Sequence, residues 1–86
     1  MEPVIQQIVR QPRQLGAIIQ SERLRRDLTQ HELASLVGVG QKTISAVENG
    51  NEGTKLDTLF SIIAKLDLDM QIVPRQREGK SIQDVF

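Results

Sequence analysis

Three consecutive polar side chains near the middle of the sequence, Gln41, Lys42 and Thr43, are of types that can hydrogen-bond to the edges of DNA bases. A glutamine can bond an adenine at two atoms, a lysine can donate to a guanine, and a threonine can contact a phosphate or the methyl group of thymine. Such contacts require the leading end of a helix that enters the major groove. Whether these three side chains can reach DNA bases therefore depends on the secondary structure of the residues on either side.

The pattern over residues 29 to 49 predicts two short helices joined by a tight turn. Thr29 and Glu32 have the spacing of a capping box, which marks the start of a helix. Gly38 tolerates the positive φ at which a helix commonly ends. A second helix over about residues 41–48, with Gly40 as an acceptable N-cap, then has Gln41 at its start.

The packing positions of this pair are filled by suitable residue types. Ala34 is small where the two helices cross, and Ile44 and Val47 face the first helix. These demands are independent of one another, so together they predict a helix-turn-helix. The alternative is a helical hairpin with no role in DNA binding.

Two more helices and one strand are expected around this unit. Residues 12–26 have helical periodicity, with Pro12 in the first turn and Asp27 able to end the helix in the left-handed conformation. A helix is expected from Thr54, with Thr54 and Asp57 as a second capping box. Residues 68–73 alternate, which is typical of a strand. The residues expected to face inward are Leu33, Leu36 and Val37 in the first helix of the pair, and Leu56, Leu59, Phe60, Ile63 and Leu66 in the last helix; Leu68, Met70 and Ile72 share one face of the strand.

The size of the chain favours self-association. A domain of 86 residues buries only about 60% of its unfolded surface and is marginal alone. It has no cysteine and one histidine, so disulfides and thiolate metal sites are excluded and no metal or cofactor is expected. We therefore expect a homodimer in which residues 68–75 pair with the same strand of a second subunit. Packing of this segment on its own domain is the alternative.

The charge balance argues against strong non-specific DNA binding. Eleven basic residues cancel eleven acidic ones, whereas non-specific binding depends on surplus Lys and Arg. A neutral chain can still bind DNA if its charges are sorted onto different faces, and Arg23, Arg25, Arg26 and Lys42 are the candidates for a basic face. No signal peptide or membrane span is expected, which predicts a soluble cytoplasmic protein. No catalytic constellation surrounds His31, Ser45 or Ser61, so no enzyme is predicted.

The stretch LGAIIQSERLRRDLTQHELASLVGVGQKTISAVENG resembles the Cro/C1-type (XRE-like) helix-turn-helix family over about residues 15–66. The resemblance implies a mainly α, lambda-repressor-like bundle of four to five helices whose third helix reads DNA. It also implies a structural ion pair between Arg23 and Glu48. Asp27 and Gly40 depart from the family pattern. The DNA-binding residues that the residue types and the resemblance indicate together are Gln30, Gln41, Lys42, Thr43, Ser45 and Asn49.

The segment KLDTLFSIIAKLDLDMQIV, with the extended lead-in before QPRQLG, is similar to HipB-like antitoxins. This implies a C-terminal strand in an intersubunit sheet, repression of the protein's own operon at a palindromic operator of double-stranded DNA, and neutralisation of a HipA-like serine/threonine kinase toxin. A stand-alone repressor of phage or mobile-element type and a protein-interaction adaptor remain alternatives. The expected parts are an extended segment over 1–11, the DNA-binding domain over 12–67, the dimerisation strand over 68–75 and a flexible tail over 76–86, in which Phe86 could dock on a partner.

Overall fold

The computed structural model describes residues 7–75, and this part of the chain contains four α-helices. They are α1 (Pro12–Arg25), α2 (Gln30–Val37), α3 (Gln41–Glu48) and α4 (Leu56–Lys65). The bounds of the first three agree with the sequence prediction to within one residue. The expected features of residues 1–6, of the tail and of Phe86 lie outside the described residues.

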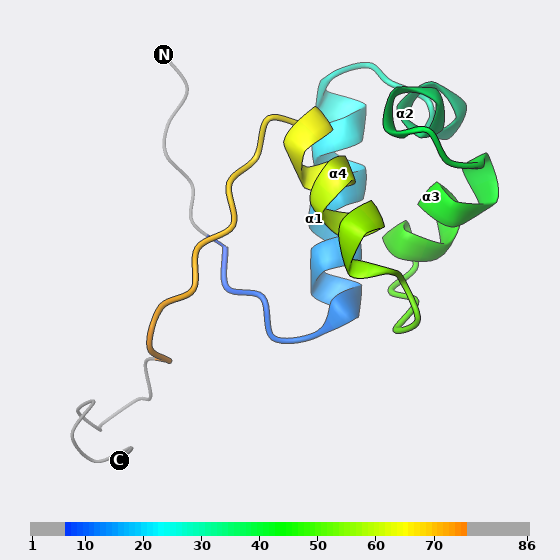
Figure 1. The fold of residues 1–86 in the computed structure, drawn as a ribbon. Helices are drawn as coiled ribbons and strands as arrows, with labels where there is room; N and C mark the ends of the chain where they lie inside the picture. The colour runs from blue at the N-terminus through cyan, green and yellow to red at the C-terminus, as the bar shows by residue number, and fades with distance from the viewer. Residues whose placement is uncertain (1–6, 76–86) are drawn as a thin grey trace.

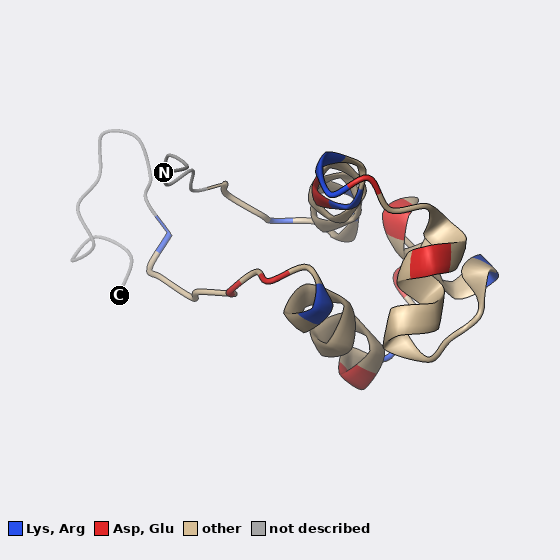
Figure 2. Cartoon of the chain, turned by 90° about the horizontal axis from the view of Figure 1, so that it is seen from above, with Lys and Arg blue, Asp and Glu red and all other residues tan. Residues whose placement is uncertain are grey.

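The four helices pack around α3 and α2. Helix α3 contacts both α1 and α2, and α2 also contacts α4. Figures 1 and 2 show α2 and α3 together on one side of α1 and α4, while residues 7–11 and 66–75 extend on the opposite side. The element predicted to bind DNA and the segment predicted to bind a second subunit therefore lie on opposite sides of the bundle.

Each helix contributes to one apolar core. Ile19 of α1, Leu33 of α2, Ile44 of α3, and Ile62 with Leu66 at the end of α4 are fully buried. Half-buried side chains surround them, including Leu15, Leu28, Val37, Val39, Leu59 and Leu68. The core thus holds α3 by its apolar face and leaves its opposite face to solvent.

All four helices end in the same way, with a left-handed residue after the last turn. Gly38 and Gly50 have φ of 86° and 84°, and Asp27 and Asp67 have φ of 57°. In each case the next residue donates its backbone N–H to a carbonyl five residues earlier, as in Leu28 to Arg23 and Leu68 to Ile63. This is the Schellman motif, which glycine usually provides. The left-handed conformation predicted for Asp27 is confirmed.

The helix starts agree only in part with the prediction. At α2 the capping box is present, because Thr29 accepts from the N–H of Glu32 and the Glu32 carboxylate accepts from the N–H of Thr29. At α4 the predicted box is wrong: the helix begins at Leu56, and the Thr54 hydroxyl instead donates to the carbonyl of Asn51. The loop after α3 therefore uses Thr54 for its own turn.

Three side chains predicted to be buried are exposed. Leu36, Leu56 and Phe60 have 51%, 63% and 53% of their surface accessible. On α4 the buried stripe is centred on Leu59, Ile62, Ile63 and Leu66, and the prediction had left out Ile62. Leu56 and Phe60 lie at the edge of this stripe, where no element within residues 7–75 covers them.

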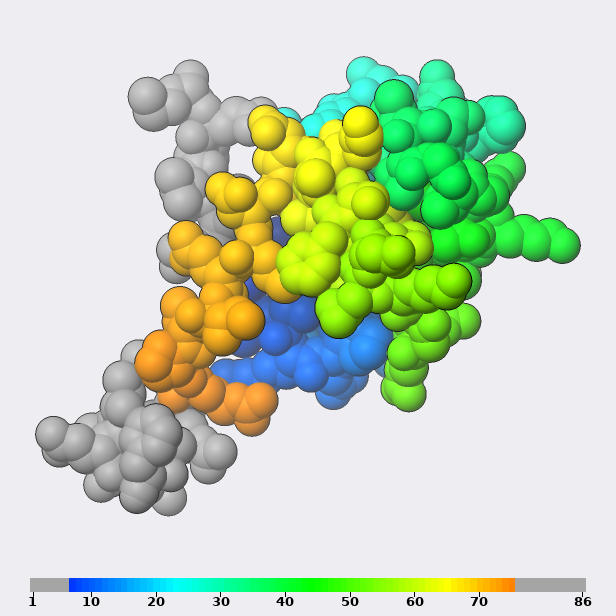
Figure 3. Space-filling model, in the orientation of Figure 1, coloured from blue at the N-terminus to red at the C-terminus, as the bar shows by residue number. Residues whose placement is uncertain are grey.

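The segment after α4 forms no strand within the described part of the chain. Residues 69–75 are exposed, and Ile72 is 94% exposed. Leu68 differs, because it packs against the core of its own chain. In Figure 3 this segment, in yellow to orange, runs down the side of the molecule away from the green α3 region. No helix within residues 7–75 is long and apolar enough to cross a membrane.

Candidate nucleic-acid interface

The turn between α2 and α3 directs the start of α3 away from the core. Gly38 takes the left-handed conformation after α2, and the backbone N–H of both Gly38 and Val39 donates to the carbonyl of Ala34. Gly40 then serves as the N-cap of α3 without a side-chain hydrogen bond. Because an L residue at position 38 would be strained, this glycine determines where α3 begins and which way it points.

One face of α3 is buried and the other is open. Ile44, Val47 and Glu48 are buried against the rest of the bundle. Lys42 and Asn49 are exposed and Ser45 is half-buried; they share the opposite face because they are spaced three or four residues apart. Figure 3 shows side chains of this green region standing out from the surface. Helix α3 therefore presents a polar ridge of the kind that enters a groove of DNA.

The predicted DNA-binding residues divide into an exposed group and a half-buried group. Gln41, Lys42 and Asn49 are exposed, at the first, second and C-cap positions of α3. Gln30, Thr43 and Ser45 are half-buried. The structure thus brings all six to the α2–α3 side, with the least hindered side chains at the two ends of α3.

The electrostatics at the start of α3 suit an anion or an electron-rich base edge. The first turn of α3 has no acidic residue and has Lys42. The unpaired N–H groups at a helix start carry a partial positive charge, which attracts phosphate. In α2, by contrast, Glu32 lies in the first turn and caps it, and the backbone hydrogen bond from Thr29 lowers the pKa of its carboxyl.

The Arg23–Glu48 ion pair expected from the family resemblance is present and buried. Arg23 Nε lies 2.7 Å from Glu48 Oε2, and Arg23 Nη2 lies 3.1 Å from Glu48 Oε1. The side chains are 8% and 2% exposed. Arg23 Nη1 also donates to the carbonyl of Leu28, at 2.7 Å. One guanidinium therefore joins α1, the linker to α2 and the end of α3.

Two glutamines continue this network to the surface. Gln30 Nε2 donates to Glu48 Oε1 at 3.1 Å, and Gln41 Nε2 donates to Gln30 Oε1 at 3.4 Å. The first residue of α2 is thus bonded to both ends of α3. The sequence placed Gln30 among the DNA-binding residues but did not reveal its contact with Glu48, because residues 18 apart have no local signal.

Gly16 is a second residue whose role the sequence analysis missed. A Cβ atom at this position would lie 2.4 Å from the carbonyl oxygen of Val47 and 2.6 Å from that of Glu48. Only glycine allows α1 to approach the end of α3 this closely. A glycine inside a helical pattern is a signal for such an approach, since it otherwise weakens the helix.

The arginines near the end of α1 do not form a free basic face. Arg25 and Arg26 both pair with Glu22, and Arg23 is paired with Glu48. The hydrogen bond from Arg26 is the main cause that lowers the pKa of the Glu22 carboxyl. Figure 2 shows the blue segments separated from one another, with red beside blue at this end of α1. These three arginines therefore do not supply the basic face for which they were candidates together with Lys42.

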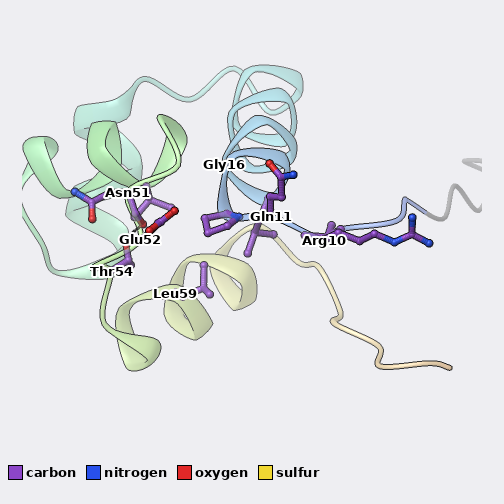
Figure 4. Close-up of a pocket in the computed structure, with 11 residues that line it drawn as sticks. Arg10, Gln11, Gly16, Asn51, Glu52, Thr54 and Leu59 are labelled. Atoms are coloured by element: carbon purple, nitrogen blue, oxygen red, sulfur yellow. Dashed lines mark hydrogen bonds between the residues drawn. The ribbon is translucent and has the colours of Figure 1, made fainter. Parts of the chain in front are cut away.

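A shallow groove of about 320 Å³ lies between the start of α1, the loop after α3, and α4. Gly16, Val47 and Leu59 contribute to its lining, with Arg10 and Glu52 at its rim. Figure 4 shows the Arg10 side chain extending away from Glu52 and from the groove. Its polar side chains do not converge on a common point, so α3 is the stronger candidate site.

Comparison with known proteins supports the same assignment. The Helix-turn-helix family model matches residues 19–73. The antitoxin HipB of Escherichia coli O6:H1 (strain CFT073) is 39% identical over 61 residues, which cover 71% of this chain and 65% of that protein. The chain thus spans slightly less than two thirds of the length of this relative.

Two solved structures are similar in fold as well as in sequence. A chain in the structure of a HipA-HipB-O2-O3 complex superposes with a TM-score of 0.75 at 36% identity, covering 81% of this chain and 99% of that one. A chain in a HipB-O4 20mer complex gives the same values. The family match over most of the chain, the buried ion pair and the exposed α3 agree, and this chain therefore belongs to the helix-turn-helix family, among the relatives of the antitoxin HipB.

Proposed function

We propose that this protein is a sequence-specific DNA-binding repressor that acts as the antitoxin of a toxin–antitoxin pair and regulates its own operon. The main observation behind the proposal is that the leading end of α3 is exposed and has no acidic residue in its first turn, while the opposite face of this helix is buried in the core. Gln41 and Lys42 would read base edges in the major groove, while Gln30, Thr43, Ser45 and Asn49 would bond phosphates or bases. Its place of action is the cytoplasm, where its operator lies.

A homodimer would give this unit its specificity. One helix-turn-helix reads few base pairs, and a two-fold dimer reads two half-sites about 34 Å apart. Met70 and Ile72 are 44% and 94% exposed, and Leu56 and Phe60 of α4 are also uncovered. Pairing of residues 69–73 with the same segment of a second subunit would bury apolar surface and satisfy backbone groups. Leu68, which packs on its own core, would anchor the strand rather than contact the partner.

The toxin partner is proposed from the relatives. A solved structure that matches this chain contains HipA together with HipB and operator segments. We infer that this antitoxin binds a HipA-like kinase on a surface that leaves α3 free. Titration of the purified kinase from the same operon into the antitoxin, with and without operator DNA, tests this: a complex that still binds DNA supports it, and failure of the two proteins to associate contradicts it.

The DNA-binding proposal is tested by replacing the reading residues. The double variant Gln41→Ala with Lys42→Ala should lose operator affinity by about 10-fold or more, because each good base contact contributes roughly 1–3 kcal/mol. Fluorescence anisotropy with a labelled duplex of the protein's own promoter measures this at several salt concentrations. The matched control is Gln20→Ala with Lys65→Ala, which removes an exposed glutamine and lysine elsewhere.

The control should bind as the parent does. Equal affinity of the α3 double variant and the parent for the same operator would refute the assignment of Gln41 and Lys42. A parent protein without a steep loss of affinity on raising the salt concentration would argue for the adaptor alternative, because phosphate contacts release counterions.

A further inference from the structure

A chain of hydrogen bonds connects the buried ion pair to the leading end of α3. Glu48 Oε1 accepts from Arg23 Nη2 and from Gln30 Nε2, both at 3.1 Å, and Gln30 Oε1 accepts from Gln41 Nε2 at 3.4 Å. No buried side-chain polar atom among the described residues lacks a partner. We call Arg23, Glu48, Gln30 and Gln41 the amide relay.

We propose that Glu48 is a positioning residue for base recognition, because it determines the orientation of the side-chain amide groups of Gln30 and Gln41. This inference rests on the proposed role of Gln41 as a base reader. Glu48 does not itself reach DNA, since it is 7% exposed and lies on the core side of α3.

The direction of the relay follows from the chemistry of its buried end. A carboxylate bonded to a guanidinium can only accept hydrogen bonds. Gln30 must therefore turn its NH2 group toward Glu48, and its carbonyl oxygen is left facing Gln41. Gln41 in turn must donate one N–H to that carbonyl. Each amide in the relay is thus held in one of its two orientations by the acceptor before it.

The bond from Gln41 to Gln30 determines which hydrogen-bonding groups of the Gln41 amide remain free to bond a DNA base. After donating one N–H to Gln30, its amide keeps one N–H and one carbonyl oxygen. Adenine presents the matching pair in the major groove, an N7 acceptor and an N6 donor. Guanine presents two acceptors, N7 and O6, and would face the carbonyl oxygen of Gln41 with one of them. The relay therefore favours adenine over guanine at the base that Gln41 reads.

The variant Glu48→Gln should reverse the relay. Whichever way the new amide turns, its NH2 opposes one donor of Arg23. Opposing Nη2, which lies 3.1 Å from Oε1, is less unfavourable than opposing Nε, which lies 2.7 Å from Oε2. The carbonyl of the new amide therefore remains at Oε2 and its NH2 occupies the Oε1 position, at a cost in stability. Gln30 then turns its carbonyl toward this NH2 and presents its own NH2 to Gln41. Gln41 must accept, and both of its N–H groups are left for the base, which suits guanine.

The test measures base preference rather than affinity alone. The parent, Glu48→Gln and Gln41→Ala are titrated against four operators that differ at the one base pair where Gln41→Ala abolishes discrimination. We expect Glu48→Gln to lower the adenine-to-guanine affinity ratio by at least about fivefold, a sizeable part of what one bidentate contact provides. In the Gln41→Ala background the same change should leave the four affinities equal.

Ile62→Val is the matched control for stability. Ile62 is fully buried in α4 and is outside the relay, so this change weakens the fold without altering base preference. Equal loss of affinity for all four operators in Glu48→Gln, or an effect that persists in the Gln41→Ala background, would overturn the inference. Absence of any base pair whose discrimination depends on Gln41 would instead overturn the proposed function.

A second variant keeps the test decisive if Glu48→Gln does not fold. Gln30→Met keeps the length of the side chain and leaves the Arg23–Glu48 pair intact, but it breaks the relay. Gln41 is then free to turn either way, so the adenine preference should fall without a gain for guanine. An unchanged preference in Gln30→Met would also overturn the inference.

Discussion

Two regions differ in how well their side chains are covered and paired. One is the contact between α1 and the end of α3, formed by Gly16, Arg23 and Glu48, which we call the joint. The other is the segment after α4. At the joint, Gly16 allows two backbones to approach, and the Arg23–Glu48 pair is buried with no buried nitrogen or oxygen atom lacking a hydrogen-bond partner. After Leu68, by contrast, apolar side chains such as Met70 and Ile72 lie exposed with no strand beside them in the described chain. The first region has its polar groups paired within one chain, and the second leaves apolar side chains exposed.

This difference separates what the subunit does alone from what it does with a partner. The joint holds α3 through the core, so the position of α3 does not depend on a second copy. The exposed segment adds nothing to that geometry and lies on the other side of the bundle (Figure 1). Changes at the joint should therefore alter folding, and changes in the segment should alter assembly.

The largest effect is expected at the ion pair. Glu48→Ala leaves the Arg23 guanidinium buried without its carboxylate, which should lower the free energy of unfolding by about 3–5 kcal/mol. Urea denaturation followed by circular dichroism measures it. Glu22→Ala, which removes a carboxylate from the more exposed pairs on α1, should cost less than about 1 kcal/mol. Similar losses in the two variants would contradict a special role for the joint.

Ile72→Asp should act on assembly alone. Burial of one isoleucine contributes about 1.5–3 kcal/mol, so two copies in a dimer would lose about 3 kcal/mol or more of association free energy. Sedimentation equilibrium across protein concentration measures this. At a concentration where the variant is monomeric, its helix content should match that of the parent. Ile72→Asp dimerising as tightly as the parent would show that this side chain is outside the interface.

Gly16→Ala should weaken the joint by overpacking. The added methyl group would lie 2.4 Å from a backbone oxygen that cannot rotate away, so α1 and α3 must separate. Such overpacking costs about 1–3 kcal/mol, read as a lower midpoint of thermal or urea unfolding. Gln20→Ala, at an exposed position of the same helix, should leave the midpoint nearly unchanged. A stabilised Gly16→Ala variant would mean that the two backbones are not in close contact.

A smaller gain is expected at the helix ends. Asp27 and Asp67 hold the left-handed position that glycine occupies after α2 and α3. Asp27→Gly and Asp67→Gly should each stabilise the fold by about 0.5–1 kcal/mol, because glycine has no Cβ to strain there. The same change at Asp69, which lacks positive φ, should not stabilise. Destabilisation by both changes would indicate that the aspartate side chains make compensating contacts.

The sequence predicted those features that depend on neighbours along the chain. The capping box of Thr29, the left-handed turns at Asp27 and Gly38, and the bounds of α3 are set by residues within a few positions of one another. Features that depend on how helices pack were missed. The exposure of Phe60 and the approach of Gly16 to α3 are examples.

The candidate site follows the same division. The side chains on α3 were found from their spacing, since one helix turn fixes which of them share a face. The hydrogen bond from Gln30 to Glu48 joins two elements, and no local pattern specifies it. A strand over residues 68–73 was predicted from alternation, but strand pairing needs a neighbour, and residues 7–75 do not provide one.

The most direct test of the whole account is nuclear magnetic resonance of the parent protein bound to its operator duplex. If the leading end of α3 reads base edges, the Gln41 and Lys42 side chains will give intermolecular Overhauser effects to base protons in the major groove. The residues of α4 and of the segment after it will give none. Contacts to DNA made only from α4 or residues 69–75, with α3 unaffected, would contradict the account.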